Sequence, residues 1–212
     1  MFLGHYGLAF AAKRASPETS LGTLTFAAQW LDELWPVLLL LGVEQVRIAP
    51  HNMAMSDLDF VSYPISHSLA TAILWGIVLG LVYFFVRRRS RGAWCIGALV
   101  ASHWVLDLIV HRPDLPLYPG GPRLGFGGWN SMALTYALEA LFYFGGLAIY
   151  LRMTRAKDAV GRWALVAYVV VQVAIYLIGG DPPPNASTVA WSALILWLFI
   201  PWAAWIDRHR TV

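Results

Sequence analysis

The chain has 212 residues, of which 58% are hydrophobic and only 13% are charged. Ordinary globular domains have roughly 45–50% apolar and about 25% charged residues, so this chain carries more apolar surface than a water-facing fold of its size can bury. The net charge of +3 is too small to indicate a nucleic acid partner, and the single cysteine excludes an internal disulfide. The composition therefore predicts an integral membrane protein whose main surroundings are the lipid bilayer.

Long apolar segments follow one another along the chain. A helix that crosses a bilayer needs about 20 mainly apolar residues. The segment from Phe2 to Ala12 has about half that length, and it predicts a short helix that enters the bundle or lies against it. Six longer segments each predict a membrane-spanning helix: Gly22–Gly42, Ser66–Val86, Gly92–Val110, Ser131–Leu151, Trp163–Ile178 and Ala190–Ile206. We therefore expect an all-α, polytopic membrane bundle of about six transmembrane helices plus the short N-terminal helix, in a single domain over residues 1–212.

The basic residues predict how this bundle is oriented. All but three of the 15 Lys and Arg residues fall in connections on one side of the six-helix arrangement. The exceptions, Arg47, Arg112 and Arg123, lie in the connections of the other side, which are Val43–Ile65, His111–Asn130 and Gly179–Val189. Cytoplasmic loops of membrane proteins are enriched in Lys and Arg, so both termini are expected in the cytoplasm.

Ionisable side chains inside the predicted helices are concentrated toward the N-terminal half of the chain. Such a group costs about 2.5–3.5 kcal/mol on insertion scales and is usually functional or paired with another polar group. The residues in question are His5, Asp32, Glu33, His67, His103, Asp107 and Glu139. The last two predicted spans have no comparable group in their interiors. Residues 120–212 are therefore expected to be mainly scaffold, and residues 1–119 to contain the site.

The spacing of His103 and Asp107 favours a metal site. Residues four apart leave the same face of a helix about one turn apart, and an imidazole and a carboxylate there can hold one divalent ion. His67 opens an inward-running span, so it is expected level with the end of the outward-running span that carries this pair. The site should then lie in the outer half of the membrane. An ion pair between helices and a proton relay remain alternative interpretations of the same residues.

Several short motifs resemble a known family. They are Gly4-His5-Tyr6-Gly7, the first span with Asp32 and then Pro36, His67-Ser68, and Ser102-His103 followed by Asp107. Over about residues 3–119 they resemble the YdjM-like family of bacterial inner-membrane proteins, which are described as metal-dependent hydrolases. The order of these residues is also similar to the ligand order of zinc-dependent phospholipase C and of single-strand-specific zinc nucleases. The resemblance implies a protein of the inner membrane of a bacterium.

The resemblance also implies a set of site residues. Its metal ligands would be His5, Asp32, His67, His103 and Asp107. The family usually has Pro-Asp-x-Asp-His in the first span, where this chain has Trp30-Leu31-Asp32-Glu33-Leu34, so one or two divalent ions, most simply zinc, are expected rather than three.

Roles for further residues follow from where the sequence places them. Glu33 or Glu139 would act as general base or would support a ligand histidine. His111, Arg112 and Arg123 are expected beside the site, where they could bind substrate.

The sequence thus favours an integral membrane, metal-dependent hydrolase that acts on a phosphoester or ester of a lipid-like substrate. Two other functions are compatible with the same residues. One is a non-catalytic membrane subunit that binds other membrane proteins in a larger complex. The other is a small transporter that uses Asp32, Glu139 and His103 as an intramembrane relay.

The expected orientation can be tested by cysteine labelling. A cysteine at position 112 or 123 should react with an impermeant maleimide added to intact cells, and a cysteine at position 89 should react only after the cells are opened. The reason is that positions 112 and 123 fall in predicted outer connections, while Arg89 lies in an Arg-rich inner one. The reverse pattern would overturn the orientation.

Overall fold

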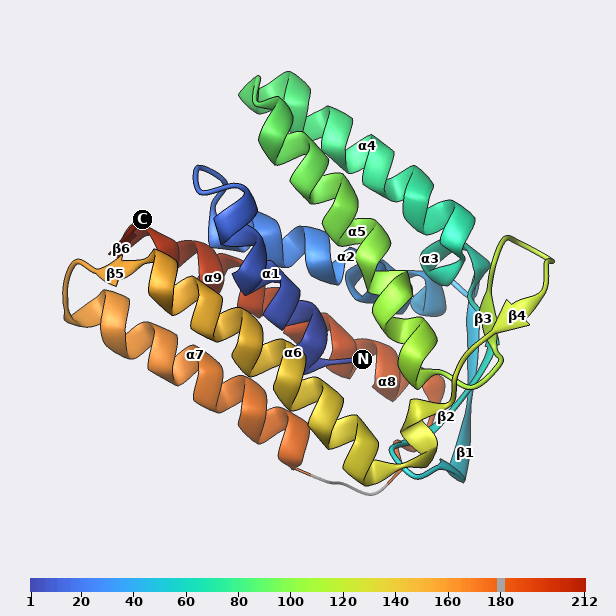
Figure 1. Ribbon diagram of the computed structural model, residues 1–212. Coiled ribbons are helices and arrows are strands. Elements are labelled where there is room, and N and C mark those ends of the chain that lie inside the picture. Colours follow the sequence, from blue (N-terminus) through green and yellow to red (C-terminus); the bar gives the residue numbers. More distant parts are fainter. Residues whose placement is uncertain (179–181) are drawn as a thin grey trace.

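Helices make up most of the computed structural model, which describes residues 1–178 and 182–212 (Figure 1). The helices are α1 Leu3–Ala15, α2 Leu21–Leu40, α3 Pro64–His67, α4 Leu69–Arg87, α5 Ser90–Val110, α6 Met132–Met153, α7 Ala159–Leu177, α8 Ala186–Leu194 and α9 Phe199–Arg208, with 3-10 turns η1 Gly128–Asn130 and η2 Ile195–Leu198. The strands are β1 Gln45–Met53, β2 Ser56–Ser62, β3 Leu115–Pro116, β4 Arg123–Leu124, β5 Arg155–Ala156 and β6 Arg210–Thr211. Each of the six predicted spans contains a helix.

Polar residues fix where the long helices begin. The side chain of the residue before α2, α4, α6, α7 and α8 accepts a hydrogen bond from a backbone N–H of the first turn. Ser and Asn or Asp are the residues best suited to this, because the first N–H groups of a helix have no partner within it. The capping residues are Ser20, Ser68, Ser131, Asp158 and Asn185.

Five helices are long and apolar enough to cross a membrane. They are α4, α5, α6, α7 and the continuous helical stretch Ala186–Arg208. α2 has a similar length but is not among them, since Gln29, Asp32 and Glu33 interrupt its apolar sequence. The six predicted segments are thus largely helical, and five helices have the length and composition of a membrane span. The apolar helices are compatible with a membrane protein.

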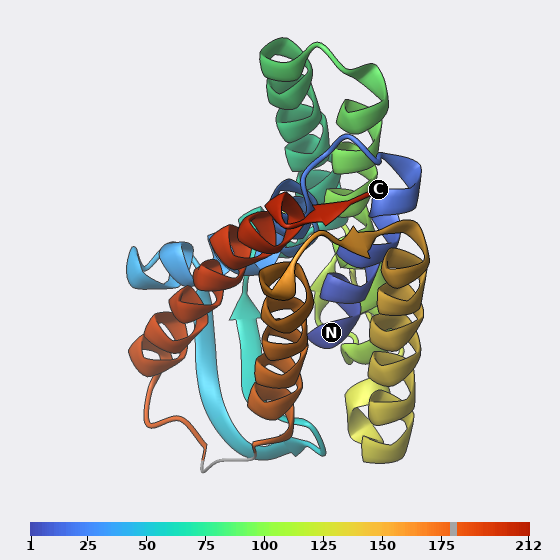
Figure 2. The ribbon, with the colours of Figure 1, turned by 90° about the vertical axis from the view of Figure 1, so that its left-hand side faces the viewer.

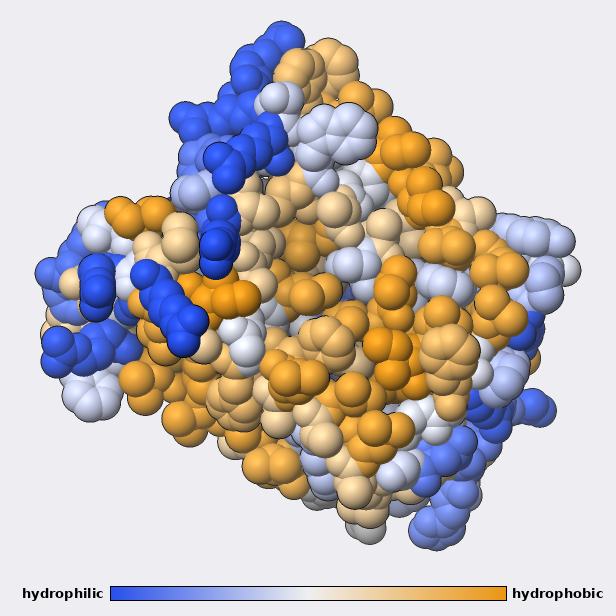
Figure 3. Space-filling view, viewed as in Figure 1, coloured by the Kyte–Doolittle hydropathy of each residue, from blue (hydrophilic) through white to orange (hydrophobic). Residues whose placement is uncertain are grey.

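The outer surface has the corresponding distribution of side chains. Large apolar side chains such as Leu74, Phe85 and Leu141 are exposed on the outward faces of α4 and α6. Figure 3 shows apolar side chains across the middle of the molecule and hydrophilic ones toward its two ends. Burying such an apolar surface in lipid removes it from water, as a bilayer-spanning protein requires.

The N-terminal helix α1 lies inside the bundle. It packs against α2, α5 and α6, and Figures 1 and 2 show it enclosed by the longer helices. Tyr6 and Phe10 are almost completely buried. The close approach of α1 to α6 depends on Gly7 and Gly146, because a Cβ atom on either glycine would collide with the backbone of the other helix. This position brings His5 to the centre of the molecule.

A β-hairpin is the main departure from the predicted all-α fold. The expected connection Val43–Ile65 contains the antiparallel strands β1 and β2, in which Val46 pairs with Phe60 and Ile48 pairs with Leu58. These apolar residues alternate with Arg47 and Asp59, which is the two-residue period of a half-buried strand. The hairpin lies within this connection, and its strands were not predicted because an alternation over a few residues gives no signal at the length of a membrane span.

The two ends of the described chain lie in different parts of the molecule. Met1 is buried beside Asp107, whereas β6 pairs with β5 at the connection between α6 and α7. The expectation that both termini lie on one side therefore finds no support in the fold. Residues 179–181 of the expected connection Gly179–Val189 lie outside the described residues.

The contact between α1 and α6 predicts a large difference between two adjacent glycines. Gly146→Ala should lower the free energy of unfolding by about 1–3 kcal/mol, because its Cβ would meet the backbone of Gly7. Gly145→Ala is the control, since no described atom lies within 4 Å of its Cβ position; it should be neutral or stabilising by about 1 kcal/mol. Denaturation in detergent, followed by circular dichroism, measures both effects. Equal destabilisation of the two variants would contradict this packing.

Candidate metal centre

Five of the predicted site residues meet at one place. His5 comes from α1, Asp32 from α2, His67 from the end of α3, and His103 and Asp107 from α5. Their ligand atoms form two groups, one of His5, His103 and Asp107 and the other of Asp32, His67 and His103. Within each group all ligand atoms lie within 4.8 Å of one another. These buried or half-buried His and Asp side chains could hold a metal ion.

Four atoms of this cluster alternate between ring nitrogen and carboxylate oxygen. Nε2 of His103 lies 3.2 Å from Oδ2 of Asp107 and 3.6 Å from Oδ1 of Asp32. Nε2 of His67 lies 3.3 Å from the same oxygen of Asp32 and 3.8 Å from that of Asp107. In tetrahedral zinc with bonds of about 2.0–2.2 Å, ligand atoms are roughly 3.3–3.6 Å apart. The atoms of Asp32, His67 and His103 form one group that could hold such an ion, and Asp107 lies beside them in the other group.

Hydrogen bonds on the other ring nitrogens orient both histidines. Nδ1 of His103 donates to the backbone oxygen of Ala28 at 2.7 Å. Nε2 of His103 is buried and has no hydrogen-bond partner among the described residues. Nδ1 of His67 lies 2.7 Å from Oγ of Ser66, whose hydroxyl donates to a carboxylate, so this nitrogen is the donor. A neutral imidazole that donates through Nδ1 keeps a lone pair on Nε2, as a metal ligand must.

The carboxylate behind Ser66 belongs to Glu44, which sequence analysis missed. Glu44 is 2% exposed, and its Oε2 accepts the Ser66 hydroxyl at 2.6 Å. Its Oε1 accepts the backbone N–H groups of Ile65 and Ser66 at 2.7 and 2.9 Å. Glu44 therefore holds the segment that carries His67. No spacing rule connects positions 44 and 66, so only the fold could reveal this contact.

His5 approaches the centre from the opposite side of Asp107. Its Nε2 lies 3.1 Å from Oδ1 of Asp107, the oxygen that also forms an ion pair with the nitrogen of Met1. The His5 ring stacks on that of His103 with centroids 3.6 Å apart. Asp107 thus uses Oδ2 toward His67 and His103 and Oδ1 toward His5. A carboxylate shared in this way could bridge two ions.

The two predicted catalytic glutamates lie in different environments. Glu139 lines the cavity beside the cluster, and its two oxygens accept the backbone N–H groups of Phe2 and Gly4, each at 2.7 Å. Glu33 is buried, and the residues that line the cavity within the described chain do not include it. Glu33 follows Asp32 directly, and adjacent residues on a helix point in directions about 100° apart. The structure therefore brings Glu139, but not Glu33, to the cluster.

The cluster opens into a cavity of about 240 Å³. Asp32, Asp107, Glu139, His67 and His111 contribute its polar wall, and the rest of the lining is mainly apolar and aromatic. The hairpin covers one side with Met55, Ser56, Leu58 and Phe60, and the backbone N–H of Met55 bonds to Trp129 O at 3.1 Å. The hairpin therefore closes the site as a cover.

The three predicted substrate-binding residues occupy different positions. His111 lines the cavity, and burial lowers its pKa. Arg112 forms ion pairs with Asp59 and with Asp114, the latter at 3.2 Å, and it donates to Oδ1 of Asn52 at 2.6 Å. Arg123 donates to the backbone oxygen of Val61 at 2.8 Å. Within the described part of the chain, neither arginine lines the cavity, and both connect the hairpin to the segment between α5 and α6.

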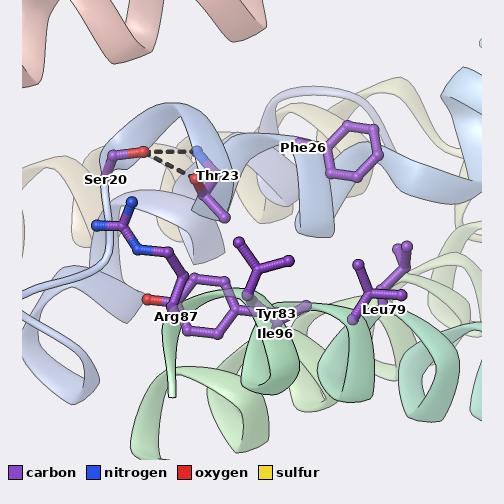
Figure 4. A pocket seen from close by; sticks show the side chains of 9 residues that line it. Ser20, Thr23, Phe26, Leu79, Tyr83, Arg87 and Ile96 are labelled. Carbon is purple, nitrogen blue, oxygen red and sulfur yellow. Dashed lines mark hydrogen bonds between the residues drawn. The ribbon is translucent and has the colours of Figure 1, made fainter. Parts of the chain in front are cut away.

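A second cavity, of about 320 Å³, lies elsewhere in the molecule. Figure 4 shows Ser20 bonded to Thr23 at one end of it, and Arg87 nearby. Among its described lining residues there is no His, Cys, Asp or Glu, so it offers no metal-ligating side chain. The metal-ligating chemistry is at the first cavity.

No family model, no curated protein and no solved structure matches this chain. The interpretation of the site therefore depends on its own geometry.

The contacts of Asp59 predict how the hairpin is held over the cavity. Arg112→Ala should accelerate amide exchange in β1 and β2 about tenfold, because charged hydrogen bonds contribute about 1.5–3 kcal/mol. Arg47→Ala is the control: its side chain, 73% exposed, also pairs with Asp59, but such a pair contributes about 0–1 kcal/mol. Hydrogen–deuterium exchange with peptide resolution measures both. If Arg47→Ala accelerated amide exchange in the hairpin as much as Arg112→Ala does, Arg112 would not be the anchor of the hairpin.

Proposed function

We propose that this chain is an integral membrane hydrolase of the bacterial inner membrane that uses a divalent metal ion, most simply zinc, to cleave an ester or phosphoester of a lipid-like substrate. The observation that supports this most is the convergence of His5, Asp32, His67, His103 and Asp107, which come from segments far apart in the sequence. A buried imidazole nitrogen without a partner is costly in an apolar bundle. A cation between these residues removes that cost.

One ion is assigned to Asp32, His67 and His103, with the carboxylate of Asp107 beside it. Their separations of 3.2–3.8 Å and the lone pairs on Nε2 of both histidines support this assignment. Asp32 is the most exposed of these side chains, with 31% accessible, so a substrate would approach the site from that side.

Zinc held by such ligands supplies hydroxide at neutral pH and stabilises negative charge that develops on a carbonyl or phosphoryl oxygen. Glu139 is the carboxylate of the cavity wall that is not among the proposed ligands. Each of its oxygens accepts one backbone N–H and has a second lone pair to accept a proton. Glu139 is therefore assigned the role of general base. Glu44 and Ser66 keep His67 in the tautomer and orientation that ligation needs.

Metal analysis of the purified protein in detergent tests this proposal. The protein should carry about one zinc per chain, and the double variant His103→Ala/Asp107→Ala should lose it while its helical circular dichroism spectrum is retained. The matched control is His209→Ala/Asp158→Ala, which removes an exposed His–Asp pair with a separation of 2.7 Å and should keep the zinc. A folded wild-type protein that binds no divalent metal would exclude the hydrolase.

The hydrogen bond between Ser66 and Nδ1 of His67 predicts a partial loss of zinc affinity when it is removed. Ser66→Ala removes the partner of Nδ1 but none of the proposed ligands, so zinc affinity should fall about 10–100-fold, as is typical for such supporting residues. Competition with a chelator measures this change. Metal bound with unchanged affinity would mean that Ser66 and Glu44 do not support the ion. Zinc binding without hydrolysis of any ester would favour a non-catalytic subunit.

A further inference from the structure

The charged side chains around the cavity are nearly all acidic. Asp32, Asp107 and Glu139 line it, and within the described residues no Lys or Arg side chain does. The nitrogen of Met1 is also at the wall, but it is paired with Asp107. His111 is 3% exposed and packs against Phe60 and Trp129. Among the residues that the structure describes, the cavity wall therefore presents no free cation to a bound anion.

Arg112, which follows His111 of the cavity wall, is engaged in contacts outside the cavity. Arg112 pairs with the two carboxylates of Asp59 and Asp114 and with the amide of Asn52. These contacts anchor the hairpin, so turning the guanidinium toward the cavity would break them. Leaving a buried or half-buried carboxylate without its partner is costly. Arg112 is thus a structural residue of the hairpin and not a phosphate ligand.

The charges of a centre with one ion cancel. A divalent ion contributes two positive charges, and the carboxylates of Asp32 and Asp107 contribute two negative ones. Glu139 adds a further negative charge at the cavity wall. A phosphoester anion that entered this cavity would lose its hydrating water and would find no excess positive charge there. Desolvating an anion without a compensating charge is strongly unfavourable.

The rest of the wall suits an uncharged group. Trp35, Phe60, Trp129 and Tyr176 supply aromatic surface, and Leu58 adds an aliphatic side chain from the hairpin. The volume of about 240 Å³ is below the roughly 300–1,000 Å³ of pockets that enclose a drug-sized ligand. The cavity therefore admits the reacting group and a short apolar part of a larger molecule.

From this charge balance we infer that the substrate is a carboxylic ester with an apolar acyl chain, and not a phosphoester. The inference rests on the proposed hydrolase function with one ion per chain. In the reaction the oxygen of water bonds to the acyl carbon, and the bond from that carbon to the alcohol oxygen breaks. The leaving oxygen takes up a proton that water gives, so the products are a carboxylic acid and an alcohol.

Three chromogenic probes test the substrate class with the zinc-loaded protein in detergent. They are p-nitrophenyl butyrate, bis(p-nitrophenyl) phosphate and p-nitrophenyl phosphate. The His103→Ala variant measures background hydrolysis. We expect the butyrate to be hydrolysed at least tenfold faster by the wild type than by this variant, and both phosphates at the rate of the variant.

The outcomes separate the two proposals. Hydrolysis of either phosphate above the His103→Ala background, with butyrate at background, would overturn the assignment to carboxylic esters and leave the hydrolase intact. Zinc binding with all three probes at background would overturn the hydrolase itself.

The variant Leu58→Arg provides an independent readout, because it places a cation on the cavity wall. Isothermal titration calorimetry should show that inorganic phosphate binds Leu58→Arg at least tenfold more tightly than the wild type, and equal affinity would mean that the wild-type cavity already binds the anion.

Discussion

The packing of helices around the site depends on the contacts that the buried carboxylate of Asp107 makes. Asp107 lies 2% exposed in the interior, where an unpaired charge would be prohibitively costly. It meets His103 on its own helix, His67 from α3 and His5 from α1. Contacts with this one carboxylate therefore hold together elements that are up to about a hundred residues apart in the sequence. The apolar packing around that carboxylate decides how close they come.

Polar contacts of this kind also explain why α1 is buried, although it is too short to span a bilayer. Its first turn presents backbone N–H groups that Glu139 of α6 accepts, and Gly7 and Gly146 allow the two helices to touch. α1 and α2 both contact helices from the two halves of the chain, so no packing boundary separates residues 1–119 from the rest. The C-terminal helices do more than surround the site, since α6 contributes Glu139 and α7 contributes Tyr176 to the cavity wall.

Charge at this site is arranged in two layers with different tasks. The inner layer, Asp32 and Asp107 with their histidines, can neutralise a divalent ion. The outer layer, Arg112 with Asp59 and Asp114, is internally neutral and fastens the hairpin. Keeping the arginine in the outer layer leaves the cavity without a free cation among the described residues. The attachment of the cover and the acidic character of the cavity wall are thus two consequences of one ion-pair network.

The sequence by itself determined which segments form the long helices and which ionisable residues lie within them, because apolar length and intramembrane charge are local properties. His103 and Asp107 could be placed on one face by their spacing alone, and His5, Asp32 and His67 could be named by resemblance. Only the tertiary structure decided that these five meet, that Glu139 reaches the cavity while Glu33 does not, and that Arg112 is occupied by carboxylates. It alone revealed the hairpin cover and Glu44 behind His67. These features depend on the relative rotation and depth of packed elements, which no periodicity within one segment records.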